Sequence, residues 1–329
     1  MNILISFIIP VYNCEKYITT CISSILSLEY FKNSFEVILI NDGSIDNSES
    51  IIRDIIHDNL NVLLINQNNL GASSARNAGL KAAQGKYVWF VDADDKINPP
   101  FLKKALEIIS NDDSYELLCF NHYKETNSEL IPCTDYNAEK VISGLDFYNN
   151  RPSGYLWNKI YKRSSIGQIQ FLDGTKNIED FYFNTKVVIK LKKILLLTDF
   201  GYYYNTTNQL STSRNSSKRN LVKLEQDTMT IHKAIINDID KSDDTSIKKA
   251  LTDNLNISIA GHLYSIIRFY TPNTLKKAIL EYSSWGVYPI SLTSNHKANL
   301  FLCIANKKTL LSSLQKLTIC FSSKNRKNR

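Results

Sequence analysis

The chain has 329 residues, of which 43% are hydrophobic and 22% are charged, as is typical of globular proteins. These proportions exclude a disordered chain, a collagen-like fibre and a membrane bundle, and no window of about 18 uncharged apolar residues is present to span a bilayer. The six cysteines form no C-x-x-C pair and no zinc spacing, which favours buried thiols in a reducing compartment. This length allows one large domain or two.

The net charge of +7 is concentrated near the carboxyl end. Residues 282–329 contain eight Lys and Arg and no Asp or Glu, which leaves 31 basic and 32 acidic residues in the rest of the chain. A neutral body argues against nucleic-acid binding, and the basic tail predicts a local anionic partner. The apolar segment 1–11 carries no Lys or Arg and is interrupted by Pro10, so we expect a first strand, no secretory signal and a cytoplasmic protein.

The first hundred residues alternate short apolar runs with helix-length segments. This strand–helix–strand order predicts an α/β fold with a mostly parallel sheet and right-handed crossovers. In such sheets, ligands bind beyond the carboxyl ends of the strands. Strands are expected at 5–10, 35–40, 62–65 and 87–91, and helices at 15–28, 46–57 and 72–83.

The remainder of the chain divides into a mixed segment and a helical one. Polar breaks at 238–244 and at Pro272-Asn273 separate the amphipathic stretches of the helical segment. We therefore expect one domain over 1–215 and a helical region over 216–329. Further strands are expected at 115–123, 155–161 and 194–198, and helices at 181–190, 219–237, 245–269 and 300–319.

Acidic residues directly follow the fourth predicted strand. Asp92 and Asp94 stand two apart on an extended segment, so their side chains point the same way and can converge on one ion. Carboxylates suit Mg²⁺ or Mn²⁺, which fill their other positions with phosphate oxygens and water. Alternatively, one Asp caps a helix at 100–110. A single Asp would suffice for a cap, so the cluster favours a metal and nucleotide-diphosphate site.

Two other positions have an ordinary structural alternative. Asp42 precedes Gly43, where a carboxylate can accept a hydrogen bond from a base N–H, but Asp-Gly is also a common turn pair. Arg76 is the one charged residue in the small-residue segment 71–79, and its planar fork suits phosphate. Taken alone, that segment favours a solvated Arg76 on the surface of an otherwise buried helix.

Four motifs in this region resemble the inverting glycosyltransferases of sequence family 2, which have the GT-A fold. The resemblance covers residues 5–100 strongly, 155–215 moderately and the final hundred residues hardly at all. The motifs stand in the family's order: Pro10-Val11-Tyr12-Asn13, Asn41-Asp42-Gly43-Ser44 with Asp46, the segment Gly71 to Gly79 containing Ala75-Arg76-Asn77, and Asp92-Ala93-Asp94-Asp95.

The resemblance implies a nucleotide-sugar site with Mn²⁺ or Mg²⁺ as cofactor. In it, Tyr12, Asn13 and Asp42 hold uracil and ribose, Asp92 lies near the ribose and the metal, and Asp94 binds the metal directly. Arg76 gains a place close to the nucleotide. The fingerprint G-x-G-x-x-G is absent after the first strand, which counts against a nicotinamide enzyme. The other expected donor contacts are Pro10, Gly71 and Ala93.

Inversion at a sugar carbon needs a base that removes the proton of the acceptor hydroxyl. The family usually takes it from the Asp of a Glu-Asp pair at a helix start, and the matching pair here is Glu179-Asp180. A free Asp, with a pKa of about 3.9, is a weak base, so partial burial beside Phe181 and Tyr182 would help by raising its pKa. The alternative for Asp180 is a helix N-cap.

Three further features extend this reading. Trp157 resembles a family segment and could offer a face to a sugar ring, although aromatic residues more often belong to the core. Arg214 stands where related enzymes have a mobile loop over the donor, and the absence of Q-x-x-R-W predicts one sugar per encounter. The segment 299–329 can form a basic amphipathic helix that docks on a membrane, or it can pack on the catalytic domain.

We therefore expect a metal-dependent inverting glycosyltransferase that moves a sugar, most readily from a UDP-sugar, to a glycan or polyprenyl-diphosphate-linked acceptor in bacterial surface polysaccharide synthesis. Two alternatives remain. A sugar-nucleotide nucleotidyltransferase would need a glycine-rich basic loop after the first strand, and Val11-Tyr12-Asn13-Cys14-Glu15 is not one. An inactive relative that only binds nucleotide, as a scaffold, would retain the same carboxylates.

Overall fold

The computed structural model describes residues 3–28, 33–57, 59–149, 154–208 and 217–291, and the single residues 299, 303, 306, 307 and 311. The chain divides into two compact units, Met1–Asn220 and Leu221–Arg329. Within the described part, no helix is long and apolar enough to cross a membrane. The helix expected at 300–319, the basic segment after it and Arg214 lie outside the described residues, apart from single positions of that helix.

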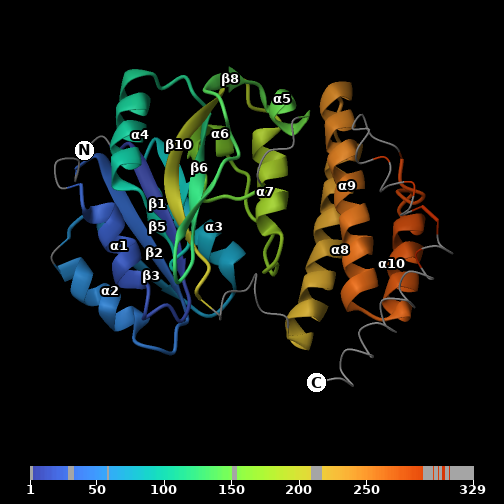
Figure 1. The fold of residues 1–329 in the computed structure, drawn as a ribbon, viewed down its shortest axis with the longest axis horizontal. Helices are drawn as coiled ribbons and strands as arrows, with labels where there is room; N and C mark the ends of the chain where they lie inside the picture. Colours follow the sequence, from blue (N-terminus) through green and yellow to red (C-terminus); the bar gives the residue numbers. More distant parts are fainter. Residues whose placement is uncertain are drawn as a thin grey trace. The chain divides into compact units, whose positions relative to one another are not determined.

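One ten-stranded sheet forms the centre of the first unit (Figure 1), in the order β3-β2-β1-β4-β9-β6-β10-β5, with β7 beside β6 and β8 beside β10. Strands β1 to β4 are mutually parallel, whereas β9 runs antiparallel to both β4 and β6. The strands are β1 (Ile5–Val11), β2 (Phe35–Asp42), β3 (Val62–Gln67), β4 (Tyr87–Phe90), β5 (Lys96–Ile97), β6 (Leu117–Glu125), β7 (Leu130–Cys133), β8 (Lys140–Ile142), β9 (Lys159–Lys162) and β10 (Ile194–Asn205).

Helices cover both faces of this sheet (Figure 1), which confirms the expected α/β architecture. Side chains that alternate along β1, such as Phe7 and Ile9, pack with the helices of one face, and Ile8 points to the other. On the first face lie α1 (Ile18–Leu26), α2 (Ser48–His57) and α4 (Pro99–Asn111), and on the second lie α3 (Ala72–Ala82) and α7 (Glu179–Val188); α5 (Gly144–Asn149) and α6 (Arg163–Ile166) are short.

Helix α3 approaches the sheet more closely than a side chain at residue 79 would permit. A Cβ atom added to Gly79 would lie 2.4 Å from Cγ2 of Ile8 and 3.0 Å from Cδ1 of Ile40. The small residues that begin this helix in the sequence therefore allow direct contact between helix backbone and strand side chains. This contact sets the distance between α3 and the strands β1 and β2.

Several elements differ from the expected pattern: β5, β7, β8, α5, α6 and α10 (Pro272–Ser284) have no expected counterpart, and β9 and β10 differ in extent. Strand β10 continues through the three tyrosines to Asn205, because its second half pairs with β6 and β5. The strand expected at 155–161 begins only at Lys159. Helix α10 begins at the expected break, because proline is compatible with a first helical turn and Thr271 Oγ1 accepts a hydrogen bond from Thr274 N at 3.3 Å.

The second unit includes the helices α8 (Lys218–Asp240), α9 (Thr245–Phe269) and α10 (Figure 1), which are joined through one buried polar cluster. The hydroxyl of Tyr282 on α10 lies 2.7 Å from Nδ1 of His232 on α8 and 2.7 Å from Nδ1 of His262 on α9. Nε2 of His232 lies 2.8 Å from the hydroxyl of Ser258. A hydroxyl can donate to one imidazole and accept from the other, so this cluster holds all three helices together.

Candidate active site

The loops after β1 and β2 are bonded to each other at the carboxyl edge of the sheet. Asn13, in the left-handed conformation with φ +52°, donates its N–H to Ser44 Oγ at 3.1 Å and accepts from Ile45 N at 2.9 Å. Asp46 accepts the N–H of Glu15 at 3.1 Å. These bonds make one rigid rim, from which the side chain of Tyr12 projects with 47% of its surface exposed.

Asp42, at the end of β2, organises the loop between β3 and α3. Its carboxylate accepts hydrogen bonds from Gln67 Nε2 at 2.7 Å, Leu70 N at 2.8 Å and Gly71 N at 2.8 Å. Gly71 has φ +94°, which a residue with a Cβ rarely adopts. Asp42 is 4% exposed, and Gly43 after it has φ +70°, so the position is both a turn and the anchor of α3.

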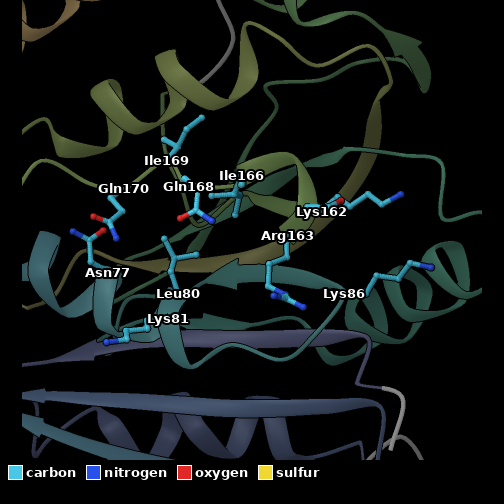
Figure 2. A pocket seen from close by; sticks show the side chains of 12 residues that line it. Asn77, Leu80, Lys81, Lys86, Lys162, Arg163, Ile166, Gln168, Ile169 and Gln170 are labelled. Carbon is cyan, nitrogen blue, oxygen red and sulfur yellow. The ribbon is translucent and has the colours of Figure 1, made fainter.

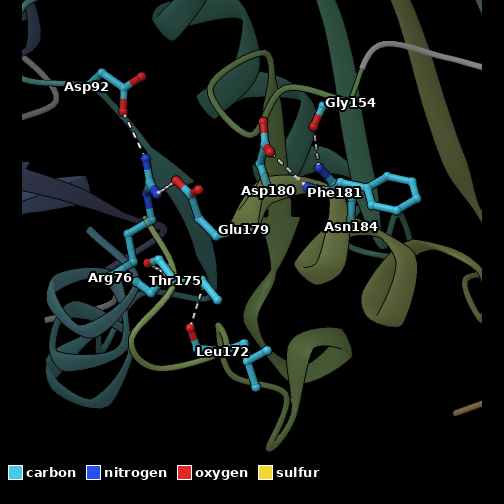
Figure 3. Close-up of polar contacts among 10 residues, drawn as sticks. Arg76, Asp92, Gly154, Leu172, Thr175, Glu179, Asp180, Phe181 and Asn184 are labelled. Carbon is cyan, nitrogen blue, oxygen red and sulfur yellow. Dashed lines mark hydrogen bonds and ion pairs between the residues drawn. The ribbon is translucent and has the colours of Figure 1, made fainter. Parts of the chain in front are cut away.

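Arg76 is buried, and the solvated surface position that its local sequence favours is wrong. Its residue is 7% exposed, and its guanidinium donates to Glu179 Oε1 at 2.7 Å and to Asp92 Oδ1 at 3.1 Å (Figure 3). Burial acts to lower the pKa of Arg76, but the two carboxylates outweigh it and hold the pKa above its usual value. A fixed positive charge therefore lies between Asp92, at the end of β4, and the start of α7.

The three aspartates after β4 occupy different environments. Asp92 keeps 36% of its side chain exposed, and burial raises its pKa against the opposing charge of Arg76. Asp94 Oδ2 accepts a hydrogen bond from Asn208 Nδ2 at 2.8 Å. Asp95 is 1% exposed and turns inward, where its Oδ1 accepts the N–H of Asn205 at 2.7 Å. Asp92 and Asp94 are therefore the members of the cluster that can face a ligand.

These two carboxylates fit a divalent cation of the Mg²⁺ or Mn²⁺ type. Such ions need only one or two protein carboxylates when a diphosphate supplies the remaining oxygens. Within the described residues, no group of three or more His, Cys, Asp and Glu side chains is gathered as a protein-only cage, so a bound ion would depend on the nucleotide. The capping alternative fails, because Asn98 occupies the N-cap of α4 and no side chain caps it.

Asp180 begins α7 beside Glu179 but points in another direction (Figure 3). Partial burial and the neighbouring charge of Glu179 raise its pKa to about 7, whereas Arg76 and Lys159 act to lower it. Its Oδ1 accepts the N–H of Phe181 at 2.8 Å. The N-cap position belongs to Ile178, with φ +51°, so Asp180 lies within the helix and is not its cap. A carboxyl group of this pKa suits proton abstraction near neutral pH.

Trp157 lies in the core instead of presenting an open ring. It is 6% exposed and stacks on Tyr202 at 4.7 Å and on Tyr155 at 4.5 Å between ring centroids. The exposed member of this stack is Tyr155, at 45%. Of the other expected contacts, Pro10 lies within β1, and Ala93 is 4% exposed between the two facing aspartates.

Sequence reasoning did not single out the residues that support these carboxylates. The hydroxyl of Tyr202 accepts the N–H of Asp92 at 3.0 Å, and Asn205 Nδ2 donates to the carbonyl of Asp94 at 3.0 Å. Lys159, fully buried, has its pKa lowered by burial to about 8 and acts on the charge of Asp180. The sequence signal for Tyr202 and Asn205 was the run of tyrosines followed by asparagine at the end of β10. The strand was expected to end before this run.

Known proteins are similar to this chain in sequence and in fold. Residues 6–172 match the family model described as Glycosyl transferase family 2. Glycosyltransferase GlyA of Streptococcus pneumoniae serotype 4 is 32% identical over 213 residues, which are 61% of this chain and 30% of that protein. The poly(ribitol-phosphate) beta-N-acetylglucosaminyltransferase TarS of Staphylococcus aureus is 32% identical over 211 residues, 62% of this chain and 36% of that protein. The chain thus spans about a third of the length of these relatives.

Solved structures share the fold of this chain. S. aureus TarS 1–349 in complex with UDP has a TM-score of 0.72 at 22% identity and covers 98% of this chain and 92% of that one. The mannosyltransferase PcManGT of Pyrobaculum calidifontis, in complex with GDP-Man and Mn²⁺, has a TM-score of 0.56 at 16% identity, covering 100% of this chain and 88% of that one. The expected GT-A architecture with a helical C-terminal region is therefore confirmed.

Proposed function

This chain belongs to glycosyl transferase family 2, and from that premise we propose that it transfers a sugar with inversion from a UDP-sugar to a glycan acceptor of the bacterial cell surface. The observation that carries the proposal is the placement of Asp180, with a pKa of about 7, beside the linked charges of Glu179, Arg76 and Asp92. The raised pKa of Asp180 supports its role as the base, and the ion pairs of Arg76 support a fixed arrangement of the carboxylates around it.

The donor fits the carboxyl edge of the sheet. Tyr12, Asn13 and Asp42 border the rim where uracil and ribose would bind, and Asp42 also holds the loop that begins α3. Asp92 and Asp94 would hold the divalent cation, which neutralises the diphosphate as a leaving group. UDP complexes of TarS, a structural relative of the same fold, support the choice of nucleotide.

In the proposed reaction, Asp180 takes the proton of an acceptor hydroxyl as its oxygen attacks the anomeric carbon. The new carbon–oxygen bond forms on one face while the bond to the β-phosphate oxygen breaks on the other, so the electron pair leaves with UDP. Arg76 stabilises this site before the reaction begins, because its burial and two carboxylates fix its position. A single displacement inverts the configuration and needs no covalent intermediate.

We take the acceptor to be a cell-surface polymer, because relatives such as TarS and the poly(ribitol-phosphate) beta-glucosyltransferase of Bacillus spizizenii are named for one. The sugar transferred, the use of a lipid-linked acceptor and contact of 299–329 with a membrane remain predictions.

Release of UDP from a panel of UDP-sugars tests the proposal, with Mn²⁺, Mg²⁺ or a chelator present. We expect one donor to be turned over with metal, and Asp94→Ala and Asp180→Asn to lose transfer while the exposed Asp54→Asn retains it. Asp180→Asn should still bind UDP in calorimetry, because the base does not hold the nucleotide. Binding of UDP by the unaltered protein without turnover of any donor would instead favour a nucleotide-binding scaffold.

A further inference from the structure

A second cavity opens at the amino-terminal edge of the sheet (Figure 2), with a volume of about 630 Å³. Leu80, Ile166 and Ile169 provide its apolar part. It is formed by the end of α3, the residue before β4, the end of β9 and the segment that follows α6. Its polar lining consists of Lys81, Lys86, Lys162, Arg163, Asn77, Ser164, Gln168 and Gln170.

The charge of this cavity is entirely positive at its lining. Figure 2 shows Arg163 between Lys81 on one side and Lys86 and Lys162 on the other. Counted over the part of the chain that the structure describes, none of the lining residues is Asp or Glu. The nearby Asp113 is ion-paired with Lys86, and its backbone carbonyl accepts from Lys162 Nζ at 2.6 Å. Asp113 therefore offsets part of the charge of Lys86 and Lys162, and it forms no ion pair with Lys81 or Arg163 in the part of the chain that the structure describes.

Arg163 is held in place by backbone. Its Nε donates to the carbonyl of Gly85 at 2.7 Å, and Nη2 lies 3.5 Å from the carbonyl of Gln84. Because these contacts orient the guanidinium plane, less conformational freedom is lost when it binds an anion. Lys81, Lys86, Lys162 and Arg163 thus line the cavity together with an apolar floor of Leu80, Ile166 and Ile169, a combination that suits phosphate groups joined by short carbon chains.

This cavity is separate from the proposed donor site. Lys86 precedes β4 and Asp92 follows it, so about 20 Å of extended chain separates the two edges. Yet one continuous segment links them: Gln168 and Ile169 line the cavity, and Glu179 and Asp180 stand at the segment's other end. Asn77 on α3 fixes this segment between its ends, because its side chain bonds both the N–H and the carbonyl of Phe171.

We propose that this cavity binds a phosphodiester-linked segment of the acceptor polymer and so holds the acceptor at a distance from the reacting hydroxyl. The assignment rests on the proposed transferase function, and its ligand is a polyol-phosphate chain. Cations bind successive phosphates, and the apolar floor contacts the carbon chain between them. Such a site retains an anionic polymer between transfers without contacting the donor.

Direct binding tests the site without turnover. A fluorescently labelled oligo(glycerol phosphate) is titrated with the full chain in the absence of donor, and a labelled dextran oligosaccharide serves as the neutral probe. We expect Lys81→Glu/Lys162→Glu to weaken binding of the phosphate oligomer by about tenfold or more and to reduce its dependence on salt. The matched pair Lys103→Glu/Lys190→Glu changes the same charge on exposed positions elsewhere in this unit and should leave binding nearly unchanged.

The neutral pair Lys81→Gln/Lys162→Gln provides the same comparison if charge reversal next to Asp113 prevents folding. UDP release from the donor alone should remain normal in every variant, so failure of the transferase proposal is read separately from failure of this one. If both Glu pairs weakened binding of the phosphate oligomer equally, the oligomer would be attracted by the overall charge of the protein and not by this cavity, which would overturn the proposal. Unaltered binding of the phosphate oligomer by the pocket variants would also overturn it.

Discussion

Arg76 and Glu179 form an ion pair, 2.7 Å between Nη1 and Oε1, that joins two parts of the chain separated by 103 residues. Arg76 lies on α3, whose start is anchored by Asp42, and Glu179 begins α7. Because Arg76 also bonds Asp92, one guanidinium links the donor side of the proposed site to the helix that carries the proposed base, Asp180. Changes at this pair should therefore affect stability and proton transfer together.

Glu179→Gln should lower the free energy of unfolding by about 2 kcal/mol, because it leaves a buried guanidinium with one charged partner instead of two. Chemical denaturation measures this directly. Glu129→Gln removes an equal charge from an exposed position and should change stability little. Equal stability of the Glu179 variant and the unaltered protein would show that Asp92 alone compensates the charge of Arg76.

The rate of transfer should rise with pH through about 7, because Asp180 accepts a proton only when ionised and its pKa is raised to about 7. Glu179→Gln should move this rise to lower pH, since the charge of Glu179 is one of the causes that raise the pKa. A series of rates at saturating donor measures both. A profile that the Glu179 variant leaves in place would assign the ionisation to another group.

Asp42→Asn should weaken UDP binding and destabilise the first unit by about 1–3 kcal/mol, because an amide group has one acceptor oxygen where the carboxylate receives three hydrogen bonds. Calorimetry with UDP and denaturation give the two values. Asp54→Asn, on the exposed side of α2, is the matched control. Loss of UDP affinity without loss of stability would assign Asp42 to the ligand alone.

The helical unit should lose stability as pH falls from about 6.5 towards 4. Burial lowers the pKa of His262 to about 4 and that of His232 well below its usual value, so protons bind the unfolded chain first. For His262 alone, the shift from 6.5 to about 4 corresponds to a loss of about 3 kcal/mol once pH is below the folded pKa.

Thermal unfolding across that pH range measures this dependence. His262→Gln should reduce the slope, whereas His57→Gln, at an exposed histidine of the first unit, should not. An unchanged slope in the His262 variant would contradict the assignment. Tyr282→Phe is a second check, because it removes the hydroxyl that both imidazoles share and should destabilise the unit even at pH 8.

The fold followed from hydrophobic patterning most directly at β1, β2 and β4, which are buried on both faces, whereas β3 is partly exposed. The four parallel strands and their three helices have the strongest periodicity, and each occurs where the sequence predicts it. The exceptions have non-local causes. The length of β10 depends on its pairing with β6 and β5, which lie far away in sequence. Helix α10 begins at Pro272, and a proline in a sequence can indicate either the end of a helix or the first turn of a new one.

The site was harder to predict in its electrostatics than in its location. Chain order indicated that Asp42, Asp92 and Asp94 share one edge of the sheet, because parallel strands end together. Arg76 was misread from its own segment, since its partner Glu179 lies far away in sequence. The burial of Arg76 results from the packing of α3 against other elements of the fold. No pattern within the sequence of α3 predicts it.

The proposed site depends on the absence of a side chain at Gly79, although this residue lies in the protein interior. Any larger residue there would push α3 off Ile8 and carry Arg76 with it, since both residues belong to the same helix. Replacement of this buried glycine would therefore disturb the position of Arg76, which is buried one turn earlier on the same face of the helix. A residue that touches no substrate should be as intolerant of replacement as one that does.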